Sequence, residues 1–192
     1  GVLFSADAFG SFIANNGRLF ADEVNWDRDY LDEGRRYYTN IVGKYGTFVR
    51  QALAKAGGLD IAYICPLHGL VWRDNFGYIL DKYTHWATYE PEEEGVLIVY
   101  ASMYGNTEFA AQALASKLCE AGMTNISLRD VSNTHVSTLI AESFKYSNIV
   151  LASVTYNLEM YPLMKNYLED MKALNVQNRA VSIIDNGSWA PQ

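Results

Sequence analysis

The chain has 192 residues, of which 49% are hydrophobic and 19% charged, as expected for a globular protein with one large or two small domains. Its net charge of −7, with no basic cluster, argues against a nucleic-acid-binding protein. No apolar run approaches the roughly 18 residues of a membrane span, so no membrane partner is expected. Only Cys65 and Cys119 are present, far apart, which predicts free thiols in a reducing, cytoplasmic setting.

Strand-like and helical segments alternate in the first half of the chain. The helical pattern could break at Gly43 or Gly46, and Gly57-Gly58 stop it. Pro66 ends the second strand-like run. We expect strands at residues 2–4 and 59–65, helices at 27–56 and 74–82, and a loop at 66–69.

The segment Pro91-Glu92-Glu93-Glu94-Gly95 has the features of a connector between domains. Its proline and glycine disfavour a helix, and its three like charges favour solvent. An acidic surface loop within one domain is the alternative interpretation. We expect a first domain at residues 1–90, a linker at 91–95 and a second domain at 96–192.

Beyond this connector, apolar strand patterns alternate with amphipathic helix patterns. Such alternation with short loops predicts an α/β domain with a parallel sheet covered on both faces. Ligands of these sheets bind at the carboxyl ends of the strands. We expect strands at residues 96–101, 126–130, 147–152 and 179–184, and helices at 108–121, 135–145 and 161–173.

The loop at residues 102–107 follows the first of these strands and precedes a helix. Free backbone N–H groups and the helix dipole make this position suited to a phosphate, and hydroxyls add donors. The loop matches neither the lysine-containing nucleoside-triphosphate loop nor the dinucleotide fingerprint. It therefore favours a phosphate monoester held by neutral donors, with flavin mononucleotide (FMN) as the leading candidate. The residues concerned are Ser102, Met103, Tyr104, Gly105, Asn106 and Thr107, with Asn106 or Thr107 expected to cap the helix.

Two further loops follow strands at the same edge of the predicted sheet. Their aromatic side chains could lie against an isoalloxazine ring, and their backbone dipoles could reach its polar atoms. Each loop alone is equally consistent with an ordinary turn, but the three together favour a flavin site. The candidate residues are Ser153, Thr155, Tyr156 and Asn157 in the second loop, and Asn186, Gly187, Ser188 and Trp189 in the third.

Asp7 and His68 each follow a strand-like run in the first half. Carboxylate and imidazole groups at strand ends are common metal ligands. From spacing alone, a turn residue and a loop donor are the simpler interpretations. His85 and His135 are expected to be surface or structural residues.

Several segments, in this order and over nearly the whole chain, resemble the flavodiiron proteins, also called A-type flavoproteins. The matching segments are 3–10, 66–73, 102–107, 155–157 with 160–162, and 186–189. The resemblance implies the C-terminal part of a metallo-β-lactamase-like αββα domain. An incomplete flavodoxin-like doubly wound parallel sheet would follow it.

The resemblance also implies an oxidoreductase that reduces dioxygen to water, nitric oxide to nitrous oxide, or both. Electrons would enter through FMN from a rubredoxin-type or NADH-linked donor. Asp7 would bridge two non-haem irons and His68 would bind one, in a head-to-tail homodimer. The family's His-x-Glu-x-Asp-His motif is not in this sequence, so we expect a fragment that does not itself retain the irons. The alternatives are a flavin-binding electron-transfer protein with a non-catalytic lactamase-like scaffold, and a chain that binds neither cofactor.

Overall fold

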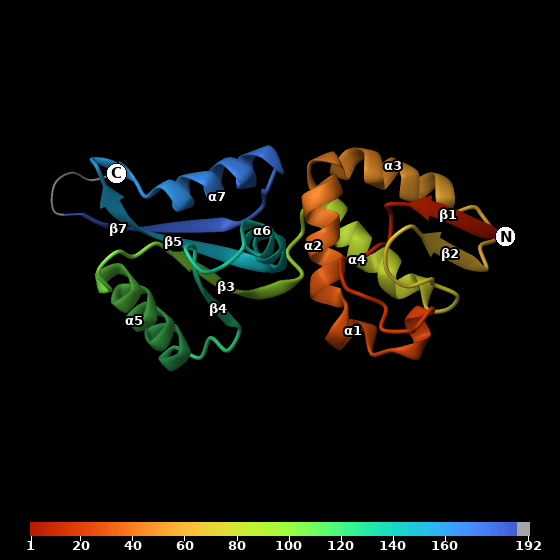
Figure 1. The fold of residues 1–192 in the computed structure, drawn as a ribbon, viewed down its shortest axis with the longest axis horizontal. Helices are drawn as coiled ribbons and strands as arrows, with labels where there is room; N and C mark the ends of the chain where they lie inside the picture. The colour runs from red at the N-terminus through yellow and green to blue at the C-terminus, as the bar shows by residue number, and fades with distance from the viewer. Residues whose placement is uncertain (188–192) are drawn as a thin grey trace. The chain divides into compact units, whose positions relative to one another are not determined.

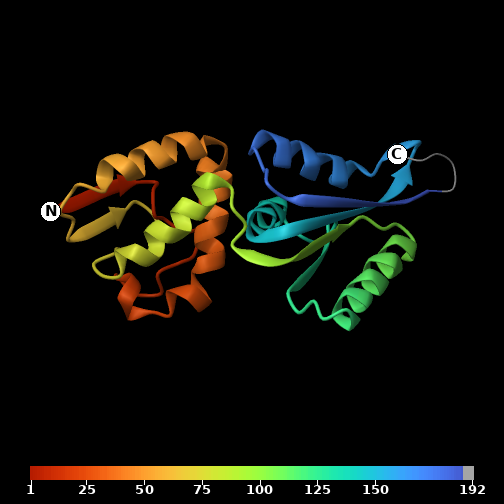
Figure 2. The ribbon, with the colours of Figure 1, turned by 180° about the vertical axis from the view of Figure 1, so that it is seen from behind.

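The computed structural model describes residues 1–187 and divides into two compact units, Gly1–Glu90 and Pro91–Gln192. Figures 1 and 2 show the ribbon from its two sides, and each unit is described here by itself. The predicted site residues Ser188 and Trp189 lie outside the described residues.

The first unit combines a small parallel sheet with surrounding helices (Figure 1). Strands β1 and β2 pair in parallel, with Leu3 opposite Ile64 and Phe4 opposite Cys65. The elements are β1 (Val2–Ala6), α1 (Trp26–Asp29), α2 (Leu31–Val42), α3 (Gly46–Ala56), β2 (Tyr63–Pro66) and α4 (Phe76–Thr88), with short 3-10 turns at Ala21–Glu23 and Gly43–Tyr45.

The long helix predicted at 27–56 is confirmed together with its break, because the 3-10 turn Gly43–Tyr45 separates α2 from α3. A second break at Tyr30 was not predicted. The strand predicted at 59–65 begins only at Tyr63, so its first half is wrong. The N–H of Ala62, just before β2, instead donates to the Gly1 carbonyl at 2.7 Å.

Aromatic side chains fill the core of the first unit. Tyr38, Tyr83 and Trp86 are at most 2% exposed, and each pair of their rings has centroids 5.0 to 5.3 Å apart. Trp26 and Trp72 form another buried contact, with ring centroids 5.0 Å apart. Buried rings carry much of the apolar burial that stabilises such a small unit.

The second unit is a parallel sheet with helices on both faces. Its parallel strands lie in the order β4-β3-β5-β7, and β6 pairs with β5 in antiparallel fashion. Helix α5 covers one face, and α6 and α7 cover the other (Figures 1 and 2). The elements are β3 (Glu93–Tyr100), α5 (Asn106–Glu120), β4 (Ile126–Asp130), α6 (Val136–Lys145), β5 (Tyr146–Tyr156), β6 (Glu159–Met160), α7 (Pro162–Ala173) and β7 (Ala180–Asn186).

This strand order confirms the predicted doubly wound parallel sheet. The chain leaves β3 toward β4 on one side and then crosses to β5 and β7 on the other. The connections therefore diverge at the carboxyl ends of β3 and β5. A crevice at that reversal is the usual ligand site of such sheets.

Three of the five residues predicted to form the linker, Glu93 to Gly95, lie within β3. Glu93 pairs with Tyr146 of β5, and a register irregularity separates this pair from the ladder that starts at Val96. The Glu93 carboxylate has partners at this end of the strand: it accepts a hydrogen bond from Asn125 Nδ2 at 2.7 Å, and Lys145 lies 3.4 Å from it.

The β5–β6 hairpin turns through a two-residue loop with unusual backbone angles. Asn157 has φ +50° and Leu158 has φ +64°, while Tyr156 pairs with Glu159 across the turn. Positive φ at both central positions is the type I′ pattern, in which Asn is favoured first and Gly second. A leucine at the second position is sterically strained.

Within residues 1–187, no helix combines the length and the apolar character needed to cross a bilayer.

Replacing Gly46 by alanine should destabilise the first unit. An added Cβ would clash with the Ala87 carbonyl and lie 2.9 Å from the Tyr89 ring. Overpacking of this kind costs about 1–3 kcal/mol. Urea unfolding followed by tryptophan fluorescence measures it, because Trp26, Trp72 and Trp86 all belong to this unit.

The matched control is Gly77→Ala in α4, where an added Cβ meets no atom within 4 Å among the described residues. That variant should be neutral or more stable by about 0.4–1 kcal/mol. Equal destabilisation by both substitutions would contradict the close approach at Gly46.

Relieving the strain at Leu158 should stabilise the second unit. The side chain is 71% exposed, so Leu158→Gly loses little burial and removes the Cβ that conflicts with positive φ. We expect L158G to be about 1 kcal/mol more stable than L158A, which shortens the side chain but keeps Cβ. Denaturant midpoints of the two variants give the comparison. A more stable L158A would show that the turn is not strained.

Candidate functional site

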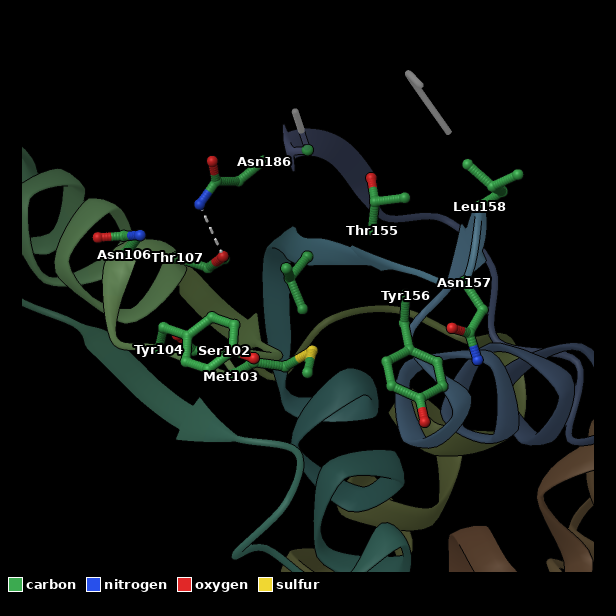
Figure 3. A pocket seen from close by; sticks show the side chains of 12 residues that line it. Ser102, Met103, Tyr104, Asn106, Thr107, Thr155, Tyr156, Asn157, Leu158 and Asn186 are labelled. Carbon is green, nitrogen blue, oxygen red and sulfur yellow. Dashed lines mark hydrogen bonds between the residues drawn. The ribbon is translucent and has the colours of Figure 1, made fainter. Parts of the chain in front are cut away.

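A pocket of about 530 Å³ opens at the carboxyl ends of β3, β5 and β7 (Figure 3). It lies at the reversal of strand order between β3 and β5. Its volume is in the range of small-molecule and cofactor sites. The lining residues come from the three predicted loops: Ser102, Met103, Tyr104, Asn106 and Thr107 from the first, Val154, Thr155, Tyr156, Asn157 and Leu158 from the second, and Asn186 and Gly187 from the third.

The start of α5 forms one end of the pocket. Gly105 has φ +88°, a conformation that suits glycine, and it is the residue before the helix. The Gly105 N–H donates to Ser102 Oγ at 3.1 Å, which closes the turn. The prediction that Asn106 or Thr107 caps the helix is wrong, because the left-handed turn at Gly105 starts the helix one residue earlier.

Asn106 and Thr107 therefore stand in the first turn of a 15-residue helix. The N–H groups of a first turn have no acceptor within the helix, and they point toward the positive end of its dipole. Thr107 is 1% exposed, and its Oγ1 accepts a hydrogen bond from Asn186 Nδ2 at 3.0 Å (Figure 3).

The helix end offers an anion neutral donors rather than cations. Residues 102–107 contain no lysine or arginine, and Glu108 in the same turn accepts from Gln112 Nε2 at 3.1 Å. Burial, and then the nearby Glu108 and Asp130 carboxylates, raise the pKa of Tyr100 at the end of β3. An anion bound here would thus be held by backbone N–H groups, hydroxyls and the helix dipole.

Apolar and aromatic side chains contribute much of the rest of the pocket, beside the polar Thr155 and Asn157. Met103 is 42% exposed and Tyr156 37%, so each presents part of its surface to solvent. The Tyr156 ring meets Tyr161 edge-on, with centroids 6.0 Å apart, which supports it from one side. A flat ligand with a phosphate tail matches this division into a polar and an apolar end.

Among the candidates within residues 1–187, Gly105 and Ser153 do not line this pocket. Gly105 shapes the turn instead. Ser153 is 7% exposed, and its Oγ donates to the Val154 carbonyl at 3.3 Å; it lines a smaller cavity of about 90 Å³ beside Met164. Val154 and Leu158 line the pocket but were not among the predicted site residues. Leu158 could have been predicted, because it follows Asn157 in the same loop.

The first unit brings Asp7 and His68 to one depression of about 350 Å³, which Tyr37 and Ser11 also line. The Tyr37 hydroxyl donates to Asp7 Oδ1 at 2.9 Å, and the Tyr37 and His68 rings have centroids 5.7 Å apart. Burial first, and then the Asp7 carboxylate, raise the pKa of Tyr37 to about 12. Within residues 1–187, the buried Ser11 Oγ has no hydrogen-bond partner.

A diiron centre requires several histidine and carboxylate ligands. No group of three or more His, Cys, Asp or Glu side chains that could hold a metal occurs among the described residues. Asp7 and His68 alone therefore do not fit a complete site for two irons.

His85 and His135 make local contacts within or beside their own helices. His85 Nδ1 lies 3.0 Å from the Asp81 carbonyl in the preceding turn of α4. His135 is the residue before α6, and its Nδ1 accepts from the Ser137 N–H at 3.2 Å.

Residues 98–186 match the family model described as Flavodoxin. An uncharacterized protein of Methanocaldococcus jannaschii is 32% identical over 98% of this chain, which covers 47% of that protein. The anaerobic nitric oxide reductase flavorubredoxin of Klebsiella pneumoniae is 30% identical over 98% of this chain and 39% of its own length. The chain thus spans about half, or less, of the length of these relatives.

Solved structures give a concordant result. The flavodiiron protein of Giardia intestinalis has a TM-score of 0.91 at 26% identity, covering 98% of this chain and 46% of that one. Rubredoxin oxygen:oxidoreductase of Desulfovibrio gigas has a TM-score of 0.88 at 29% identity, and the match covers 98% of this chain and 47% of that one. These matches confirm the family predicted from the sequence motifs. The chain is similar to the flavodiiron proteins over nearly its whole length, and residues 98–186 match the flavodoxin family model.

Proposed function

We propose that the pocket of the second unit binds FMN. The observation that carries this proposal is the position of the pocket, over the start of α5 and at the reversal between β3 and β5. In flavodoxin-like sheets, FMN binds at this reversal. The match of residues 98–186 to the flavodoxin family supports the same ligand.

The two ends of the pocket suit the two ends of FMN. The phosphate would accept hydrogen bonds from the N–H groups of the first turn of α5 and from the Thr107 hydroxyl. Met103, Tyr156 and Leu158 would form apolar walls for the isoalloxazine ring. When bound, FMN supplies one- and two-electron transfer, and the chain's residues orient and tune it.

For the whole protein we propose an FMN- and diiron-dependent oxidoreductase that reduces dioxygen, nitric oxide or both. One similar protein is named as a nitric oxide reductase and another as a rubredoxin oxygen:oxidoreductase, which supports this reaction class. A rubredoxin-type or NADH-linked donor would deliver electrons to FMN. A cytoplasmic location and a head-to-tail homodimer belong to the same proposal.

Within that proposal, Asp7 and His68 are part of the iron ligand set. Their shared depression supports this role, and the hydrogen bond from Tyr37 would hold the Asp7 carboxylate in place. Two ligands do not hold two irons, so the chain's first unit contributes only part of the centre.

The flavin proposal predicts that the full chain binds FMN more tightly than riboflavin, which lacks the phosphate. Hydrogen bonds to a charged group contribute enough for about a tenfold or larger preference. Quenching of flavin fluorescence on titration with the protein measures both affinities. Thr107→Val, which removes the hydroxyl at nearly constant volume, should weaken FMN binding about tenfold and leave riboflavin binding unchanged.

Ser116→Ala is the matched control, because Ser116 is an exposed hydroxyl residue of the same helix that bonds only locally to the Gln112 carbonyl. It should change neither affinity. Equal affinities for FMN and riboflavin, or no binding of either, would contradict the proposal.

A further inference from the structure

We infer that Asn186 is a positioning residue for the phosphate end of the pocket: its side-chain amide orients the Thr107 hydroxyl so that this group donates to the FMN phosphate. The inference rests on the proposed FMN site. It assigns to Asn186 a role through Thr107 rather than direct contact with the flavin ring.

The two residues come from distant parts of the chain. Asn186 is the last residue of β7, and Thr107 is the second residue of α5. The bond from Asn186 Nδ2 to Thr107 Oγ1, at 3.0 Å, is the dashed line in Figure 3. Asn186 is half-buried and Thr107 is nearly fully buried, so this bond is largely shielded from competing water.

The direction of this bond determines what the hydroxyl can do. A threonine hydroxyl has one proton to donate and lone pairs that accept. Because the Asn186 amide donates to Oγ1, the Thr107 proton is left for another acceptor. The phosphate is an acceptor, and residues 102–107 supply no cation. Each correctly oriented neutral donor therefore contributes to the affinity for the phosphate.

The backbone of β7 fixes where Asn186 stands. Asn186 pairs with Val154, the last pair of the parallel ladder between β5 and β7, which ties the amide to the sheet. The sheet thereby holds the amide, and the amide holds the hydroxyl of Thr107, a residue that lines the pocket before the ligand arrives. Such preorganisation improves affinity because less order is lost on binding.

Affinities for FMN and riboflavin, measured for the full chain, its Asn186→Ala and Thr107→Val variants and the double variant, test this inference. We expect N186A to weaken FMN binding about tenfold and to leave riboflavin binding unchanged. In the T107V background, N186A should change FMN affinity no further, because the group it orients is gone. Asn186→Asp, which can only accept from the hydroxyl, should weaken FMN binding more than N186A.

Unchanged riboflavin affinity also shows that each variant is folded. Gln112→Ala, on the exposed face of α5, is the control and should change neither affinity. An equal loss of FMN and riboflavin binding in N186A, no loss at all, or additive losses in the double variant would overturn the inference alone. Failure of the unmodified chain to bind FMN would overturn the proposed function and this inference with it.

Discussion

The parallel pairing of β3 with β5 is the constraint on which the second unit depends. The ladder runs from Val96 opposite Asn148 to Tyr100 opposite Ala152, which are buried or half-buried residues. Because β4 then lies on one side of β3 and β7 on the far side of β5, the following loops diverge at one edge. The pocket exists because these loops diverge there, and α5 begins at its rim.

The chemistry of the pocket follows from that placement. A helix that begins at the rim brings N–H donors and a positive dipole end, so a loop without lysine or arginine is still suited to an anion. Neutral donors favour an anion only when they are already oriented. The bond between Asn186 and Thr107 supplies this orientation across a sequence separation of 79 residues.

The predictions that succeeded depend on local pattern. The apolar runs within β3, β4 and β5 and the loop at 102–107 are continuous in sequence, so the parallel sheet and the position of this loop at its edge could be predicted. One error involves a distant partner, because Glu93 joins β3 by pairing with Tyr146. Another involves the local backbone: the left-handed Gly105, rather than Asn106 or Thr107, is the residue that precedes α5. Sequence spacing likewise cannot show that Asn186 reaches Thr107, because only the folded sheet brings them together.

A crystal structure of the chain soaked or co-crystallised with FMN tests the central claim most directly. The account predicts phosphate oxygens within hydrogen-bond distance of Thr107 Oγ1 and of the backbone N–H groups that begin α5, with the isoalloxazine ring beside Tyr156. A phosphate held by other residues, or a flavin bound outside this pocket, would contradict it.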